Sequence, residues 1–183
     1  MKRLFINLLL CLAFSDNALA DIDYPVHSDK WTKKYDAHFK KYSKRYFGPL
    51  FDWHWFKSQG IAESGLDENS KSHVGASGIM QLMPDTYIEI NDKNPHFLEV
   101  DSPRWNIAAG IYYDRLLYRK FDKIPEQEKL YLALASYNAG YSRVLRAKKK
   151  TANENAGWHD IRPHLPTQTR AYVSRIQKLM GQE

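Results

Sequence analysis

Hydrophobic side chains recur three and four residues apart along most of this chain, which is the spacing of one face of an α-helix. The clearest case is a stripe of Leu130, Ala133, Leu134 and Tyr137. Similar stripes predict further helices over the segments 31–42, 52–64, 79–90, 105–121, 141–149 and 167–180. The fold class is therefore predicted as mainly α, built from several short helices.

Glycine, proline and small polar residues mark the predicted ends of these helices. Asp52 is the expected N-cap of the second helix, and Gly65 ends it. Residues 65–79 are rich in Gly, Ser, Asn and Asp, which indicates a loop with room for a small β-hairpin. Residues 152–166 are likewise predicted as loop.

The first 20 residues have the order of a secretory signal peptide. Lys2 and Arg3 precede an apolar run over 4–13, which is shorter than the ~20 residues that span a bilayer. The segment Ala18-Leu19-Ala20 fits the small-residue cleavage site, and an uncleaved anchor is the alternative. The only cysteine, Cys11, lies inside this leader and follows a bulky leucine, which argues against lipidation.

The expected domain organisation follows from this leader. Residues 1–20 form the signal peptide, 21–45 an N-terminal segment that packs on or precedes the domain, and 46–183 a single globular domain. Signal cleavage leaves no stable membrane anchor, and the exported protein is expected in the periplasm.

Composition narrows the function classes. The chain is 43% hydrophobic and 26% charged, which is typical of a folded soluble protein. Its net charge is +6, but the basic residues are scattered, so nucleic acid is not expected as a partner. The seven histidines lack the tight spacing of metal ligands, and there is no Gly-rich phosphate loop. We therefore expect neither a metal nor a cofactor.

Glu63 lies where a predicted helix meets the Gly-rich loop. Alone, it would be interpreted as a solvated helix glutamate. The residues that follow change this interpretation, because residues 63–86 read ESGLDENSKSHVGASGIMQLMPDT. This string resembles the first motif of the SLT-type lytic transglycosylases, a family with a goose-type lysozyme-like fold. The matching positions are Glu63, Ser64, Ser72, Gly75, Ala76, Gly78, Ile79, Met80, Gln81, Leu82, Met83, Pro84 and Thr86.

Two further blocks resemble the same family in the same order. Residues 135–140 read ASYNAG, and residues 165–173 read LPTQTRAYV. The segment 106–113 is similar to the family's helix that precedes the second block. Gln168 departs from the pattern, because the family often carries glutamate there, and an amide has no charge.

The resemblance implies a peptidoglycan lytic transglycosylase that cleaves the MurNAc-β-1,4-GlcNAc bond and forms 1,6-anhydro-MurNAc ends. Glu63 would act as general acid and then as base, with its carboxyl pKa raised by burial. The substrate-binding residues carried over are Ser72, Gln81, Met83, Tyr137, Asn138 and Tyr172. Met80 is more simply interpreted as core packing.

Two alternatives remain open at this point. A hydrolytic lysozyme on the same fold would use the same residues with water as the acceptor. A catalytically silent peptidoglycan-binding module of an envelope machine would need no acid. The expected partners are peptidoglycan glycan strands and proteins of an envelope machine, and a monomer is expected. Exo or endo cleavage, the biological process and the role of residues 21–45 are not written in the sequence.

Overall fold

The computed structural model describes residues 24–94, 97, 99–151, 153 and 155–182. Its α-helices are α1 (Asp36–Phe47), α2 (His54–Ser64), α3 (Pro84–Lys93), α4 (Pro103–Tyr118), α5 (Glu126–Ala139), α6 (Tyr141–Lys148), α7 (Trp158–Ile161) and α8 (Thr167–Leu179). Two short 3-10 helices, η2 (Arg119–Phe121) and η3 (Arg162–His164), extend α4 and α7. The mainly helical class predicted from the sequence is confirmed. The expected signal peptide and Cys11 lie outside the described residues.

Three details differ from the sequence prediction. First, α1 begins at Asp36 rather than near Trp31, because the chain before it forms turns. Second, α7 and η3 occupy part of the predicted loop 152–166, and α7 is too short for a helical stripe to be recognised. Third, the expected β-hairpin is reduced, in the described residues, to isolated bridges that Ser77 forms with Lys71 and Leu82.

The start of α2 is a smaller correction. Its N-cap position is Trp53 rather than Asp52. The Asp52 carboxylate still accepts the His54 backbone N–H at 3.0 Å, so Asp52 caps the turn that leads into the helix.

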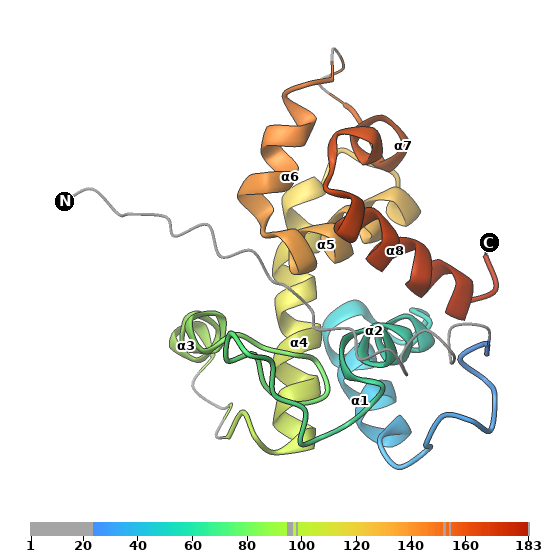
Figure 1. Cartoon of the computed structure of the whole chain (residues 1–183), viewed down its shortest axis with the longest axis vertical. Coiled ribbons are helices and arrows are strands. Elements are labelled where there is room, and N and C mark those ends of the chain that lie inside the picture. Colours follow the sequence, from blue (N-terminus) through green and yellow to red (C-terminus); the bar gives the residue numbers. More distant parts are fainter. Residues whose placement is uncertain (1–23, 95–96, 98, 152, 154, 183) are drawn as a thin grey trace.

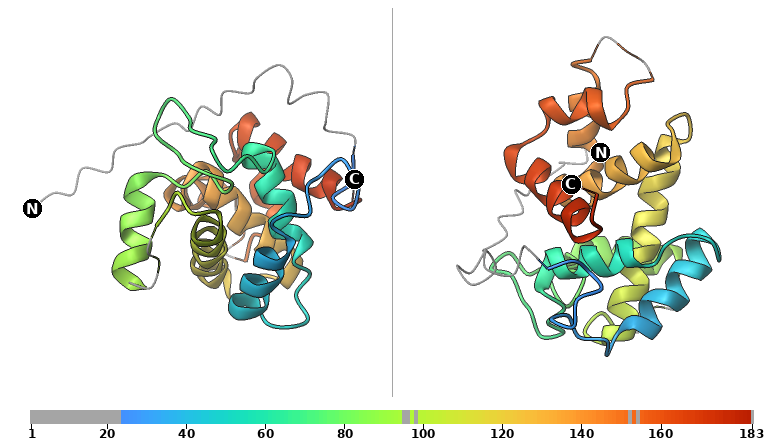
Figure 2. Two further views of the ribbon diagram at one scale, coloured as in Figure 1. Left: turned by 90° about the horizontal axis from the view of Figure 1, so that it is seen from below. Right: turned by 90° about the vertical axis from the view of Figure 1, so that its right-hand side faces the viewer.

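Helix α4 runs along the length of the molecule and joins its two halves (Figure 1). The helices α1, α2 and α3 and the loop 65–83 gather around the first half of α4, and α5 to α8 gather around its far end. Figure 2 shows α8 lying across α2 in the perpendicular view as well. The buried side chains form two apolar clusters that match these halves: the first cluster lies around α1, α2 and the first half of α4, and the second lies around the far end of α4 and α5 to α8. Residues from both α2 and α4 contribute to each cluster, so these two helices form the seam between them.

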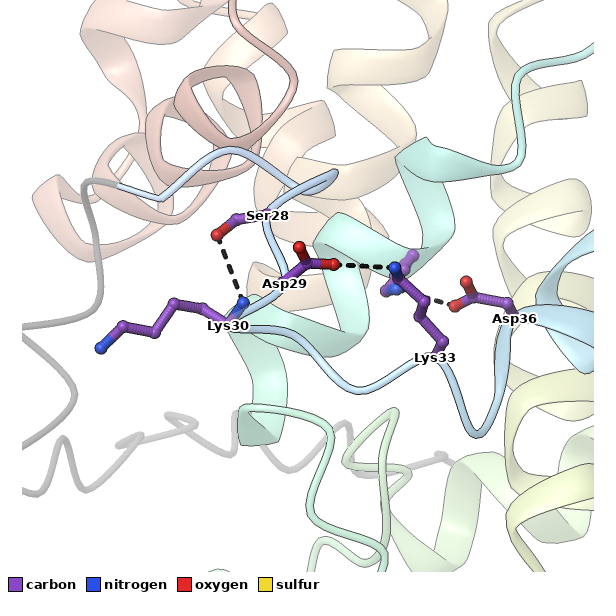
Figure 3. Close-up of polar contacts among 6 residues, drawn as sticks. Ser28, Asp29, Lys30, Lys33 and Asp36 are labelled. Carbon is purple, nitrogen blue, oxygen red and sulfur yellow. Dashed lines mark hydrogen bonds and ion pairs between the residues drawn. The ribbon is translucent and has the colours of Figure 1, made fainter.

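The segment 24–35 packs on the domain ahead of α1. Val26 and Trp31 are buried in the first cluster, and the Val26 N–H donates to the Leu179 carbonyl at 2.8 Å. Figure 3 shows the local contacts of this segment, where Lys33 pairs with Asp29 at 2.7 Å. Asp36, the first residue of α1, pairs with the buried Lys57 of α2 at 2.7 Å.

Within the described residues, none of the helices combines the length and the apolar character that a membrane span requires. In the same part of the chain, the His, Asp and Glu side chains do not gather into a group that could hold a metal ion.

Candidate active site

Glu63 lies in the last turn of α2, on the seam between the two apolar clusters. Its neighbours Ile61 and Ala62 belong to the first and the second cluster respectively. Only 7% of Glu63 is exposed. Gly65 ends the helix directly afterwards in a left-handed conformation with φ 66°, which glycine adopts without strain. The sequence therefore places a carboxyl inside the protein at the point where the chain leaves the helix.

Helix α8 supplies the groups that contact this carboxyl. The Tyr172 hydroxyl donates a hydrogen bond to Glu63 Oε1 at 2.6 Å. Arg175, one turn further along, donates to the Ala62 carbonyl at 3.3 Å, and its charge acts on Glu63. The second carboxyl oxygen, Oε2, is buried and has no hydrogen-bond partner among the described residues. Tyr172 therefore fixes Oε1, whereas Oε2 is left without a hydrogen-bond partner in the described residues.

Burial raises the pKa of Glu63 from an ordinary value of 4.5 to about 8. The hydrogen bond from Tyr172 and the charge of Arg175 oppose this shift, but they are weaker than the desolvation of the carboxylate. Near neutral pH the carboxyl is therefore mostly protonated. Because Oε1 accepts a hydrogen bond, the proton belongs on the unpartnered Oε2.

Tyr137 joins the site from α5. Its hydroxyl donates to the Met80 carbonyl at 2.7 Å, and its ring packs against both apolar clusters and against Tyr113. The charge of Glu63 contributes to raising the Tyr137 pKa well above its ordinary value, after the larger effect of burial. Tyr137 therefore links the loop after α2 to the second half of the protein and lies within electrostatic reach of Glu63.

The loop 65–83 is fastened to both sides of the seam. Ser64, beside Glu63, donates its hydroxyl to the Ile79 carbonyl at 2.9 Å. The Asn106 side chain on α4 accepts the Met80 N–H at 2.7 Å and donates to the Ser77 and Val100 carbonyls at 2.9 and 3.1 Å. These hydrogen bonds, which are buried or partly buried, fix the loop relative to the carboxyl.

The backbone conformation and close packing at Gly78 explain why this position of the motif is a glycine. Its φ is 74°, and a Cβ there would lie 2.5 Å from Asn106 Nδ2. Only a residue without a side chain allows the loop backbone to approach the Asn106 amide this closely.

Ser72 and Gln81 shape the loop. The Ser72 hydroxyl accepts the Ala76 N–H at 2.9 Å and closes a turn. The Gln81 amide donates to the Ser70 and Gly78 carbonyls at 3.1 and 2.9 Å, and its backbone has a φ of 43°. The described hydrogen bonds of both side chains therefore lie within the loop rather than at Glu63.

Met83 and Asn138 occupy half-buried positions. Met83 is the N-cap residue of α3, and Asn138 follows Tyr137 on α5. The Asn138 Nδ2 atom is buried without a hydrogen-bond partner in the described structure. Of the six substrate-binding residues predicted from the sequence, only Tyr172 hydrogen-bonds to Glu63 in the described part of the chain.

The structure adds residues that the sequence reasoning did not single out. Arg175 is one, and its position one helical turn after Tyr172 is the signal that could have found it. Asp114 is another, and it is fully buried on α4 beside Gln59 of α2. It continues the apolar stripe of Ile107 and Ile111, so an acidic residue at a core position of a helix is its signal.

The part of the chain that contains Glu63 matches a known protein family. The family model described as "Transglycosylase SLT domain" matches residues 56–159, which is more than half of the chain. The matched region includes Glu63, the loop after it and Tyr137, whereas α8 with Tyr172 lies beyond its end.

Curated relatives are similar over most of this chain. The membrane-bound lytic murein transglycosylase F of Yersinia enterocolitica is 35% identical over 70% of this chain and 28% of its own length. The protein of the same name from Shewanella pealeana is 32% identical over 81% of this chain and 30% of its own length. The chain thus spans under a third of these relatives.

Solved structures are similar in fold. The 70 kDa soluble lytic transglycosylase of Escherichia coli superposes with a TM-score of 0.67 at 25% identity, over 81% of this chain and 24% of that protein. An inactive glutamate-to-glutamine mutant of the lytic transglycosylase Slt of Pseudomonas aeruginosa gives 0.66 at 27% identity, over 80% and 23%. The lysozyme-like architecture expected from the sequence is confirmed by this likeness.

Proposed function

The chain belongs to the transglycosylase SLT domain family, and from that premise we propose that it is a peptidoglycan lytic transglycosylase with Glu63 as its single catalytic acid and base. The observation that carries the proposal is the state of Glu63: a buried carboxyl whose pKa is about 8, with one oxygen held by Tyr172 and the other without a partner in the described residues. A carboxylic acid that is still protonated near neutral pH can give its proton to a glycosidic oxygen.

In the first step, Glu63 Oε2–H protonates the leaving GlcNAc oxygen, and the bond from MurNAc C1 to that oxygen breaks. The substrate's own 2-acetamido group stabilises the positive charge at C1, as in substrate-assisted glycosidases. Tyr172 and Arg175 then stabilise the Glu63 carboxylate, because the hydroxyl donates to Oε1 and the arginine charge favours the ionised form.

In the second step, the MurNAc C6 hydroxyl attacks C1, and the Glu63 carboxylate takes up the hydroxyl proton. The products are a 1,6-anhydro-MurNAc end and a free GlcNAc hydroxyl, and no water is consumed. The ring closure is intramolecular, which gives C6–OH an advantage over water. Glu63 is protonated again and ready for the next cleavage.

The six other predicted residues take supporting parts in this proposal. The rings of Tyr137 and Tyr172 help to bury Glu63, whereas the Tyr172 hydroxyl favours its ionised form. Ser72, Gln81, Met83 and Asn138 contact the glycan around the reacting sugar. The unpartnered Asn138 Nδ2 is a donor that a sugar hydroxyl could satisfy. We place the reaction in the periplasm, where its substrate lies, with residues 1–20 as the export signal.

The test is digestion of purified peptidoglycan by the wild type and by Glu63→Gln. We expect glutamine to abolish release of soluble glycan, because it has the same shape but no transferable proton. Glu68→Gln is the matched control, since Glu68 lies five residues away and pairs with Lys34 on the surface. Equal digestion by wild type and Glu63→Gln would exclude this function.

Product analysis separates lytic from hydrolytic cleavage. Mass spectrometry of the released muropeptides should find ends that are one water lighter than the hydrolysed form. Reducing MurNAc ends would instead indicate a lysozyme that uses water as the acceptor. No digestion by the wild type, with tight binding to the sacculus, would indicate a silent binding module.

A further inference from the structure

A second carboxyl lies inside the seam next to Glu63. Asp114 of α4 and Gln59 of α2 are both fully buried, and Gln59 Nε2 donates a hydrogen bond to Asp114 Oδ1 at 3.3 Å. Gln59 precedes Glu63 by four residues, so the two side chains lie on the same face of α2. The seam between the apolar clusters therefore contains a short row of polar groups, from Glu63 through Gln59 to Asp114.

This row leaves two acceptors without a donor. Asp114 Oδ2 and Gln59 Oε1 are both buried, and neither has a hydrogen-bond partner among the described residues. If Asp114 were ionised, both atoms would be acceptors, and each would carry the desolvation cost of an unmade hydrogen bond. The existing bond is also long, whereas hydrogen bonds to charged groups are shorter than neutral ones.

Protonation of Asp114 would give both of these atoms a hydrogen-bond partner. A carboxylic acid has one O–H donor and one carbonyl acceptor, and a primary amide has N–H donors and one carbonyl acceptor. The acid and the amide can form a reciprocal pair in which Gln59 N–H donates to Asp114 Oδ1 and Asp114 Oδ2–H donates to Gln59 Oε1. The first of these bonds is present, and the second would give a partner to both unpartnered atoms.

We propose that Asp114 is a positioning residue for the cleavage reaction: a neutral carboxylic acid, locked to the Gln59 amide, that keeps a second negative charge away from Glu63. This inference rests on the proposed function of Glu63. Asp114 contacts no substrate in this proposal and acts only through the environment of the catalytic carboxyl.

The groups around Asp114 favour its neutral form. Burial raises the pKa of Asp114 well above its ordinary value; the hydrogen bond from Gln59 opposes this shift, and the charge of Glu63 adds to it. Tyr137 of α5, Tyr172 of α8 and Tyr113 of α4 are the other titratable groups that feel its charge, and all three are neutral phenols in this pH range.

The arginines next to Asp114 in sequence and on α8 contact other groups. Arg115, the next residue on α4, has its guanidinium over the Phe47 ring of α1 and the Tyr118 ring. Arg175 of α8 acts on Glu63. In the described structure the Asp114 side chain has one hydrogen bond, which it accepts from Gln59.

The catalytic consequence concerns proton donation. An ionised Asp114 would raise the Glu63 pKa further and make the glutamate a weaker acid toward the glycosidic oxygen. With Asp114 neutral, the Glu63 carboxylate formed in the first step is the one negative charge in the row of Glu63, Gln59 and Asp114. Tyr172 and Arg175 can then stabilise it without competition from a second anion.

The experiment measures the alkaline limb of kcat/KM in three variants, because this limb reports the Glu63 pKa of the free enzyme. In Asp114→Asn the limb should stay at the wild-type pH, since asparagine can pair with Gln59 as the neutral acid does. In Gln59→Glu, two adjacent acids share one proton, and their charge should move the limb up by about one pH unit. The double variant Gln59→Glu/Asp114→Asn restores one acid and one amide, and the limb should return.

A measurement without substrate tests the inference independently of activity. The protein carries 13C-labelled aspartate side chains, and Asp114→Asn identifies the Asp114 resonance. We expect this resonance to stay at the position of a protonated carboxyl at pH values well above the ordinary aspartate pKa. A resonance that titrates near the ordinary aspartate pKa, or an alkaline limb that falls in Asp114→Asn, overturns the inference. Neither result affects the test of Glu63→Gln, so the two proposals fail separately.

Discussion

Replacement of Glu63 by glutamine should make the protein more stable near neutral pH, although it removes the proposed catalytic group. Between about pH 4.5 and about pH 8 the unfolded chain releases the Glu63 proton, while the folded protein retains it. The folded state then binds more protons, so the free energy of unfolding falls as pH rises through this window. Each pH unit costs about 1.4 kcal/mol, which amounts to about 3 kcal/mol at pH 7.

Glutamine has no proton to release, so Glu63→Gln escapes this loss. It can still accept the Tyr172 hydrogen bond through its amide oxygen. We expect wild type and variant to have similar stability near about pH 4.5, and the variant to be more stable by up to about 3 kcal/mol at pH 7.

The assay is urea unfolding of both proteins at several pH values, with equal m-values as the check that both transitions are two-state. Glu68→Gln serves as the control, because its carboxylate is exposed and its pKa is lowered by the hydrogen bond from Lys34. That replacement should give no gain at neutral pH. Parallel stability curves of wild type and Glu63→Gln across the window would refute the reasoning, because they would show that Glu63 ionises normally in the folded protein.

Three further changes test other parts of the site. Tyr172→Phe removes the hydrogen bond to Glu63 Oε1, and this hydrogen bond lowers the Glu63 pKa. The alkaline limb of the pH profile of peptidoglycan cleavage should therefore move up by about one pH unit. A limb at the wild-type pH would contradict the role of this contact. Gly78→Ala should lower the free energy of unfolding, measured in urea, by about 3 kcal/mol. Gly181→Ala is the control, because Gly181 has a similar φ of 70° but open space around its Cβ, and it should lower the free energy of unfolding by about 1 kcal/mol. Ser64→Ala should cost about 1 kcal/mol and speed limited proteolysis within the loop 65–83, because the Ile79 carbonyl loses its donor.

The sequence predicted the helical architecture, and it singled out Glu63 as the candidate acid, because both are local patterns. The apolar stripe from Leu130 to Tyr137 predicts α5. The residues from Glu63 to Gly78 have the spacing that one particular loop conformation requires. The structure gives the reason for this spacing, since Gly78 lets the backbone approach Asn106, and Ser64 ties the loop back to α2.

Other parts of the site could not be predicted because they depend on which helix faces meet. Asp114 and Gln59 lie 55 residues apart, and neither belongs to a motif with fixed spacing. The pattern along α4 gives the buried face, but only the packing of α4 against α2 shows that a carboxyl on this face finds an amide opposite. Likewise, the Ser72 hydroxyl is directed to the Ala76 N–H, a local turn that no stripe or motif indicates.

The bond between Tyr172 and Glu63 joins residues 109 positions apart, and Arg175 reaches back 113 positions to Ala62. During translation, Glu63 therefore leaves the ribosome long before α8, the helix that carries Tyr172 and Arg175. A nascent chain lacks the hydroxyl and the guanidinium that complete the acid, so cleavage competence should arise only when α8 docks. Such late assembly would tie the onset of the proposed activity to the completion of the fold.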